Sequence, residues 1–363
     1  MMKILTIVGA RPQFIKVASV SRAIQQYNQN NSDPIQEIIV HTGQHYDKNM
    51  SDVFFAEMQI PKPDYHLGIG GSSHGAMTGR MLEKIEEVIL QEKPDVVLVY
   101  GDTNSTLAGA IAAVKLHIPV AHVEAGLRSF NMKMPEEVNR VLTDQISRWL
   151  FCPTETAVKN LQNEGIVERT QALITNVGDV MYDAVLFYRK IAKPTDKISS
   201  LIDELSDNFY LATVHRAENT DDPVRFSNIM DALNNISETT PVVLPLHPRT
   251  RKLLGSDYSS QVRLIEPVGY FDMITLLSHC QAVFTDSGGL QKEAFFFHKP
   301  CVTLRDETEW VELIEYGVNI LAGFSNEKII NAEKMIRQKP ENYSNLLYGD
   351  GNAAQKIITY LRF

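Results

Sequence analysis

The sequence predicts an α/β fold with two Rossmann-like domains, each built on a doubly wound parallel sheet. Short runs of consecutive apolar, often β-branched residues alternate with amphipathic segments along the whole chain. Such apolar runs are typical of parallel strands buried on both faces, and the amphipathic segments supply the crossover helices. The length of 363 residues exceeds what one hydrophobic core usually organises, and a polar stretch interrupts the alternation near the middle. We therefore expect two comparable domains that face each other across a cleft.

The predicted strands and helices locate the domain boundary. In the first half, apolar runs predict strands at 4–8, 37–40, 96–100, 119–123, 149–152 and 172–177. Helical spacing between strands occurs, for example, over 81–89 and 110–116. In the second half, strands are predicted at 210–214, 242–246, 262–265, 282–285 and 301–304. The interruption at 178–208 places the domains at 1–178 and 179–363, with the last helix able to pack back on the first domain.

Charge and cysteine content exclude several classes of protein. Acidic residues outnumber basic ones by 44 to 35, which argues against nucleic acid or an anionic membrane as the main partner. Cys152, Cys280 and Cys301 are far apart and lack CxxC spacing, which excludes a disulfide framework and a cysteine-based zinc site. The N-terminal apolar run is too short for a signal peptide, and no run approaches the length of a membrane span. We expect a soluble, cytoplasmic protein.

Charged residues follow several predicted strands of the first half. Ligands of open parallel sheets bind beyond the carboxyl ends of the strands, so these residues are site candidates. Arg11 and Lys16 place two cations at a helix N-terminus, which suits a phosphate or carboxylate, although solvated surface charges are the alternative. Asp102 either lines the crevice or caps the next helix. Glu124 closes an apolar strand, where a charge needs a partner.

The segment MPEEVNR predicts the start of a helix. Pro135 and the two glutamates after it are typical of a first helical turn. One glutamate is expected simply to interact favourably with the positive end of the helix dipole. Glu136 and Arg140 are four residues apart and share a helix face. We therefore expect a carboxylate held by a guanidinium and presented to the site.

Two histidines follow predicted strands of the second half. His215 and His247 each stand directly after an apolar run, with an arginine one or two residues later. An isolated histidine is more often structural, but a histidine and an arginine together at a strand end favour a site.

A phosphate cradle is predicted after the strand at 282–285. Ser287, Gly288 and Gly289 stand between this strand and a helix, where backbone N–H groups bind phosphate. Glu293 lies one turn into the helix and is placed to accept hydrogen bonds from ribose hydroxyls. Walker A and GxGxxG patterns are absent here, so ATP hydrolysis and NAD chemistry lose support.

Taken together, the motifs resemble the non-hydrolysing UDP-N-acetylglucosamine 2-epimerase family. They are, in order, GARPQFIK, HTGQHYD, YGDTNST, HVEAGLRS, MPEEVNR, VHRAEN, TDSGGLQKE and LRDETEW, and they cover almost the whole chain. The resemblance implies the two-domain GT-B fold, with the nucleotide held mainly by the C-terminal half. It also implies C2 epimerisation of a UDP-N-acetylhexosamine by elimination and readdition of UDP, with no cofactor and no metal. A homodimer that feeds surface polysaccharide synthesis, such as O-antigen or capsule, is the corresponding expectation.

The resemblance also implies roles for single residues. The acid/base candidates are Asp102, Glu124 and Glu136, with the face that each serves left open. The residues expected to support them or the leaving diphosphate are Lys16, Arg140 and His215. The residues expected to bind UDP are Arg11, Ser287, Gly288, Gly289, Glu293, Phe271 and Arg305. A second, regulatory UDP-GlcNAc site would involve Gln44, His45 and His247.

The chain departs from the family pattern in ways that leave the substrate open. The usual TERPE segment has Trp310 and Val311 in place of its Arg-Pro pair, and the usual QHREML and KDRQTL stretches are replaced at 44–47 and 68–80. HYDKNM, HGAMTGRML and LRDETEWVE look like the branch that acts on UDP-2,3-diacetamido-2,3-dideoxyglucuronate, which is the alternative substrate. A GT-B glycosyltransferase, a hydrolysing relative and a non-catalytic sensor are less favoured alternatives.

Overall fold

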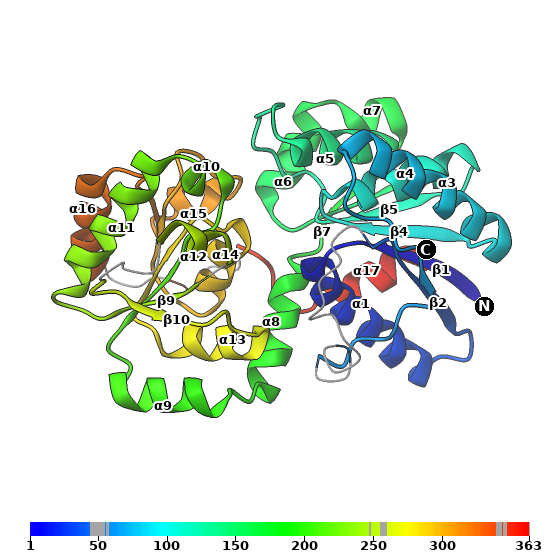
Figure 1. The fold of residues 1–363 in the computed structure, drawn as a ribbon. Helices are drawn as coiled ribbons and strands as arrows, with labels where there is room; N and C mark the ends of the chain where they lie inside the picture. The colour runs from blue at the N-terminus through cyan, green and yellow to red at the C-terminus, as the bar shows by residue number, and fades with distance from the viewer. Residues whose placement is uncertain are drawn as a thin grey trace. The chain divides into compact units, whose positions relative to one another are not determined.

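The computed structural model describes residues 1–43, 55, 58–246, 248–254, 260–338, 343 and 347–362 (Figure 1). Contacts divide the chain into two compact units. The first contains Met1–Ala184 and Leu346–Phe363, and the second contains Val185–Asn345. Each unit has one parallel sheet, which confirms the predicted α/β class. The division falls after Ala184, a few residues beyond the boundary expected at residue 178.

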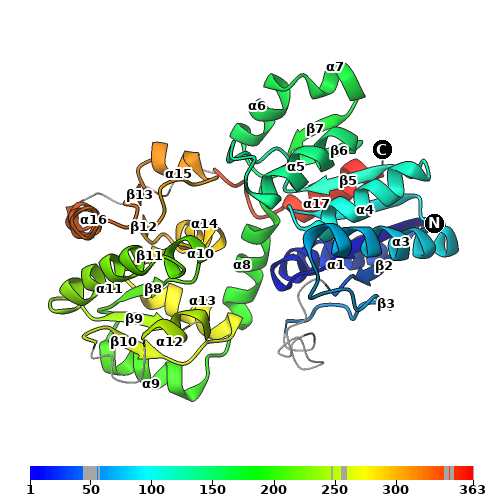
Figure 2. The same ribbon diagram turned by 45° about the horizontal axis from the view of Figure 1, so that its top comes forward.

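The first unit is built on a seven-stranded parallel sheet in the order β3-β2-β1-β4-β5-β6-β7. Its strands are β1 (Met2–Val8), β2 (Ile35–His41), β3 (Tyr65–His66), β4 (Val96–Tyr100), β5 (Val120–Val123), β6 (Trp149–Cys152) and β7 (Leu173–Asn176). Its helices are α1 (Arg11–Asn30), α3 (His74–Glu92), α4 (Asn104–Lys115), α5 (Pro135–Ile146), α6 (Glu155–Asn163), α7 (Ile166–Thr170) and α17 (Ala353–Leu361). Helices α3, α4 and α5 cover one face of the sheet, and α1 and α17 cover the other (Figures 1 and 2).

Burial explains why the central strands of this sheet read as unbroken apolar runs. All five residues of β4 are buried, as are the last five of β1, because helices cover both faces. Gly109 of α4 lets that helix approach the sheet, since a Cβ there would lie 3.1 Å from a side-chain carbon of Ile7. The core of this unit therefore lies between the sheet and its flanking helices.

The second unit repeats the design with six parallel strands in the order β10-β9-β8-β11-β12-β13. They are β8 (Tyr210–Thr213), β9 (Val242–Pro245), β10 (Arg263–Ile265), β11 (Ala282–Thr285), β12 (Cys301–Thr303) and β13 (Asn319–Leu321). Its helices are α9 (Asp196–Leu205), α10 (Ala217–Thr220), α11 (Pro223–Ser237), α12 (Pro248–Leu254), α13 (Tyr270–His279), α14 (Gly288–Phe296), α15 (Val311–Glu315) and α16 (Asn326–Gln338). Helices α11 and α16 lie side by side and enclose a core against the sheet (Figure 2).

Hydrogen bonds at the N-terminus of helix α17 attach it to the first unit. The carboxylate of Asp183, on α8 (Val180–Ile191), accepts hydrogen bonds from the backbone N–H groups of Ala353 (3.2 Å) and Ala354 (2.8 Å). Just before this cap the chain crosses itself at Gly178, where a Cβ would lie 2.9 Å from the carbonyl oxygen of Tyr348. The apolar face of α17 is buried, and the helix packs against α1. In the described part of the chain, no helix has both the length and the hydropathy of a membrane span.

Candidate active site

The site candidates of the first unit lie at the carboxyl edge of its sheet. Lys16 is in the second turn of α1, which follows β1. Asp102 is in the turn between β4 and α4, and Glu124 directly follows β5. Glu136 and Arg140 are on α5. Because these strands are neighbours in a parallel sheet, the residues after them come together in space.

Lys16 and Glu124 form an ion pair at this edge. The Lys16 ammonium donates to Glu124 Oε2, and the two side chains are only 13% and 9% exposed. Glu124 thus has the partner that its position at a strand end predicted. It also has φ of +72°, a conformation that residues other than glycine rarely adopt. A Cβ on Gly101 would lie 3.3 Å from the same carboxylate oxygen, so the turn that carries Asp102 passes close to the pair.

Asp102 is held by Arg140 through a charge-assisted hydrogen bond to its carboxylate. Burial raises the pKa of Asp102, the Arg140 charge opposes this, and the negative charge of Glu124 adds to it. The Asp102 side chain remains 32% exposed, so its carboxylate is still accessible. A carboxyl group with a raised pKa and a partly exposed side chain is suited to take up and release a proton.

The backbone that carries Asp102 is fixed at three consecutive carbonyls, those of residues 100–102. Gln13 Nε2 donates to the first (2.7 Å), His122 Nε2 lies 2.7 Å from the second, and Asn139 Nδ2 donates to the third (2.9 Å). These side chains come from α1, β5 and α5, and all three are buried. The position of Asp102 is therefore determined by three separate elements.

The expected pairing of Arg140 with Glu136 is wrong. Arg140 donates to Glu137 Oε2 (3.0 Å) as well as to Asp102. Glu137 is 1% exposed and also accepts hydrogen bonds from the backbone N–H groups of Ser129 (3.0 Å) and Phe130 (2.9 Å). The loop before α5 thus turns the second glutamate inward. Glu136 is exposed, and within the described ranges its side chain makes no hydrogen bond or ion pair.

Three of these supporting residues were missed by sequence reasoning. Gln13 stands three residues after the helix N-cap Ala10, a capping-box position that offered a signal. His122 interrupts an otherwise apolar strand, which is a weaker signal. Glu137 could not be told from Glu136, because both stand in the first turn of the helix.

In the second unit, Asp286 anchors the residues that follow β8. Its carboxylate is fully buried and accepts hydrogen bonds from the backbone N–H groups of His215 (2.9 Å) and Arg216 (2.9 Å) and from Asn219 Nδ2 (3.2 Å). The His215 side chain is 36% exposed, with Nδ1 3.5 Å from Asp286. Asp286 directly precedes the predicted cradle, and the sequence alone did not single it out as the residue that supports the backbone of His215.

The predicted phosphate cradle forms the N-terminus of α14. Ser287 is the N-cap, and its hydroxyl accepts a hydrogen bond from the N–H of Leu290 (3.5 Å). A Cβ on Gly288 would lie 2.2 Å from Glu309 Oε1, so the chain itself requires glycine there. A Cβ on Gly289 would meet no atom within 4 Å. The second glycine thus faces open space at a helix N-terminus, where backbone N–H groups can bind an anion.

Arg305 follows β12, the strand beside the one that leads into this cradle. It is 1% exposed, its NH1 donates to Glu309 Oε2 (3.0 Å), and its Nε lies 3.4 Å from Glu218 Oε1. Burial alone would raise the pKa of Glu309, but the charges of Arg305 and Arg216 outweigh this and lower it. Arg305 therefore braces the segment at 305–309 from within and links it to Glu218 on α10.

The remaining candidates are placed as follows. Arg11 is the half-buried first residue of α1, and Glu293 is half-buried in α14. Phe271, on α13, is half-buried, with its ring 6.0 Å from that of Tyr188. Trp310 is 4% exposed and packs in the core, with the Lys292 ammonium 4.1 Å from its ring. Gln44, His45 and His247 lie outside the described residues.

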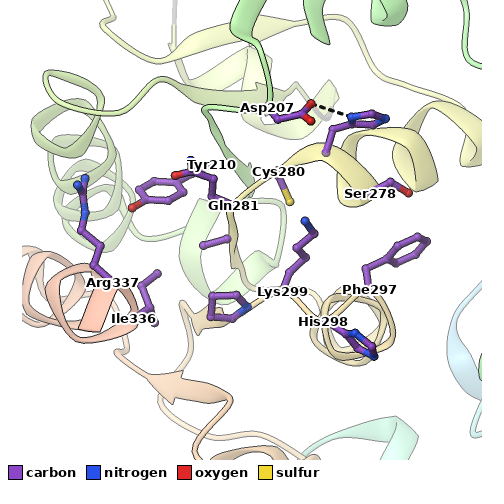
Figure 3. Close-up of a pocket in the computed structure, with 13 residues that line it drawn as sticks. Asp207, Tyr210, Ser278, Cys280, Gln281, Phe297, His298, Lys299, Ile336 and Arg337 are labelled. Carbon is purple, nitrogen blue, oxygen red and sulfur yellow. Dashed lines mark hydrogen bonds and ion pairs between the residues drawn. The ribbon is translucent and has the colours of Figure 1, made fainter. Parts of the chain in front are cut away.

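A separate depression of about 760 Å³ lies at the amino-terminal ends of β8 and β11 (Figure 3). Its polar lining includes an ion pair between Asp207 and His279 (2.7 Å) together with Lys299 and Arg337. None of the candidate residues lines it. Among the described residues, no group of three or more histidine, cysteine or acidic side chains is arranged to hold a metal ion.

Comparison with known proteins agrees with the motifs. A family model described as UDP-N-acetylglucosamine 2-epimerase matches residues 28–362. The chain is 58% identical over 362 residues to the UDP-2,3-diacetamido-2,3-dideoxy-D-glucuronate 2-epimerase of Pseudomonas aeruginosa, with 99% of each chain covered. It is 44% identical over 373 residues to the UDP-N-acetylglucosamine 2-epimerase of Methanocaldococcus jannaschii, covering 100% of this chain and 99% of that protein.

Solved structures give the same result. The Methanocaldococcus jannaschii enzyme in complex with UDP-GlcNAc and UDP matches with a TM-score of 0.88 at 44% identity, covering 99% of each chain. A trehalose 6-phosphate synthase from Burkholderia multivorans, at 10% identity and a TM-score of 0.58, shares the fold alone. The predicted family and its two-domain GT-B type of fold are thereby confirmed. The chain belongs to the UDP-N-acetylglucosamine 2-epimerase family, a family of enzymes.

Proposed function

We propose that the protein is a non-hydrolysing epimerase that inverts C2 of a UDP-linked 2-acetamido sugar, of the UDP-GlcNAc to UDP-ManNAc type. The observation that carries the proposal is the pair of carboxylates at one sheet edge, each held by a cation. Lys16 binds Glu124 and Arg140 binds Asp102, and Glu124 is close enough to Asp102 to raise its pKa. Two such groups are what proton removal and return at one carbon require.

The chemistry explains why UDP has to leave. The hydrogen on C2 is not next to a carbonyl, so its removal alone would leave an unstabilised carbanion. In the proposed step a carboxylate takes the C2 proton while the C1–O bond breaks, and the electron pair of that bond leaves with UDP. This gives a 1,2-ene. In the return step a UDP oxygen attacks C1, and a proton is added to the opposite face of C2.

The proposed roles follow the two units. Asp102, Glu124 and Glu136 exchange protons, and Lys16 and Arg140 hold two of these acids in place. In the second unit, Arg305 braces the cradle and Phe271 contributes to UDP binding, while Glu293 accepts hydrogen bonds from ribose. The groups assigned to the diphosphate are the backbone of Ser287, Gly288 and Gly289 and the side chains of Arg11 and His215. A cradle of backbone donors stabilises a departing diphosphate as its charge develops.

A uronate substrate is the second candidate, and one observation favours it. The identity to the diacetamido-dideoxyglucuronate epimerase is 58%, against 44% to the UDP-GlcNAc epimerase of Methanocaldococcus jannaschii. The same elimination and readdition would apply to a UDP-2,3-diacetamido-2,3-dideoxyglucuronate. We also propose a cytoplasmic homodimer that supplies surface polysaccharides such as O-antigen or capsule. A regulatory UDP-GlcNAc site involving Gln44, His45 and His247 stays a prediction.

The test is NMR of the protein with each sugar nucleotide separately in deuterium oxide. We expect the C2 epimer to form with solvent deuterium at C2 and without net release of UDP. The better substrate identifies the sugar. An epimer without deuterium would contradict the proton-transfer mechanism. Stoichiometric UDP would indicate a hydrolysing enzyme, and product formed only with an added acceptor would indicate a glycosyltransferase.

A further inference from the structure

His122 makes two short contacts, and both are to atoms that only accept. The side chain, on β5, is fully buried. Its Nδ1 lies 2.7 Å from Asp144 Oδ1 on α5, and its Nε2 lies 2.7 Å from the carbonyl oxygen of Gly101. A peptide carbonyl carries no hydrogen, so Nε2 must donate. If Nδ1 lacked a proton, its lone pair would face a carboxylate oxygen at hydrogen-bond distance in a fully buried site.

A proton on Asp144 is the alternative way to satisfy Nδ1, and the surroundings of Asp144 oppose it. Asp144 Oδ2 accepts hydrogen bonds from Arg128 NH1 (2.7 Å) and from the backbone N–H of Gly126 (3.2 Å). The carboxylate is therefore ionised, and both ring nitrogens of His122 donate.

The charges of this buried group balance. Arg128 also donates from Nε and NH2 to the two carboxylate oxygens of Glu164, at 2.7 and 2.8 Å. Two cations, His122 and Arg128, thus face two carboxylates, Asp144 and Glu164. Buried charges persist only when they are paired and hydrogen-bonded, and this arrangement satisfies both conditions.

We propose that His122 is a doubly protonated imidazolium that acts as a positioning residue for Asp102. Its Nε2–H clamps the Gly101 carbonyl, which belongs to the peptide bond that leads into Asp102. Gly101 has φ of +63°, in the left-handed region, and donates its N–H to the carbonyl of Val123. Together with the His122 contact, this hydrogen bond holds the turn at Gly101 against β5. The protonation state stands on the geometry alone, whereas the effect on turnover rests on the function proposed above.

The protonation state is tested on the unaltered protein by NMR of histidine labelled with nitrogen-15. Of the 10 histidines, the one whose signals disappear in His122→Gln is His122. At neutral pH we expect both of its ring nitrogens to carry protons in the wild-type protein, and one to lose its proton in Asp144→Asn. If His122→Gln does not fold, the assignment rests on contacts to Gly101 protons. A neutral His122 ring in the wild-type protein would overturn the proposal.

The positioning role is tested by the kinetics of His122→Gln. Glutamine keeps one donor and loses the other, so the turn shifts while its main contacts remain. We expect kcat to fall by roughly 10²-fold, as for a small misplacement of a reacting group, with KM changed less than about 3-fold. The matched control is His117→Gln, at an exposed position of the same unit, which should keep full activity.

An unchanged kcat in a folded His122→Gln would overturn the positioning role. If the wild-type protein itself shows no epimerase activity, the proposed function fails, and the NMR experiment still decides the protonation state. The two failures are therefore distinguishable.

Discussion

Asp102 and Asp286 occupy equivalent places in the two units and have opposite surroundings. Each follows the strand that lies beside the first strand of its unit, β4 beside β1 and β11 beside β8. Asp102 is 32% exposed and is bound by the side chain of Arg140, whereas Asp286 is fully buried and binds backbone N–H groups. The comparison teaches that topology brings an aspartate to the carboxyl edge of each sheet, and that its partners decide whether its side chain stays partly exposed or supports the backbone.

The largest expected effect is that of Asp102→Asn on turnover. Asparagine keeps the shape of the side chain but cannot exchange a proton, so kcat should fall by roughly 10²–10⁴-fold. The free energy of unfolding should change by less than about 1 kcal/mol, because the Asp102 side chain is partly exposed. Steady-state kinetics and urea denaturation measure the two quantities. Full turnover in the folded variant would remove Asp102 from the reaction.

The same substitution at Asp286 should have the opposite signature. Asp286→Asn places an amide NH2 among buried N–H donors, which should lower the free energy of unfolding by about 3 kcal/mol. Urea denaturation followed by a probe in the second unit measures this loss. Equal stability losses in the two asparagine variants would contradict the distinction drawn between the aspartates.

Another acid, Glu37 on β2, sharpens the comparison because hydroxyl groups rather than a cation hold it. Thr6 and Ser21 donate to its carboxylate (2.8 and 2.5 Å). Burial raises the pKa of Glu37 from 4.5 to about 7. The folded protein therefore holds this proton in a pH range where the unfolded chain releases it, so stability falls as pH rises from about 4.5 to about 7.

Glu37→Gln should remove that pH dependence. Relative to wild type, the variant should gain stability across the same window, by at most about 3 kcal/mol at its upper end. Urea denaturation of both proteins at a series of pH values checks this. A difference in stability that does not grow with pH would contradict the assignment.

The smallest expected effects come from the two glycines of the cradle. Gly288→Ala forces a methyl group against Glu309 and should lower the free energy of unfolding by about 1–3 kcal/mol. Gly289→Ala meets open space inside a helix and should raise it by up to about 1 kcal/mol. If a phosphate binds here, Gly289→Ala should also weaken UDP binding, measured by calorimetry. Equal stability effects would mean that Glu309 moves away freely.

The sequence predicted all the described strands except β3 and β13. Strands such as β4 are buried on both faces and therefore appear in the sequence as unbroken apolar runs. In contrast, β3 has two residues and β13 has three, and both are at sheet edges. Such strands carry too few residues for a periodicity, and their pairing is decided by the strand beside them.

The sequence could predict those candidate residues of the site that directly follow a strand. Asp102 and Glu124 were found because they follow apolar runs, and Lys16 as a helix-start cation. The partners that fix them, His122 and Gln13, act across elements distant in sequence, which local patterns do not reveal. The choice between Glu136 and Glu137 depended on the loop at 129–131, which no spacing rule describes.

The return of α17 to the first unit has a consequence for biosynthesis. The whole second unit, Val185–Asn345, separates β7 from the residues that complete the first unit. During translation, the face of α1 that packs against α17 stays exposed until Ile357, Ile358 and Leu361 have emerged from the ribosome. The unit synthesised first is thus the one completed last, and its nascent form exposes an apolar surface until then.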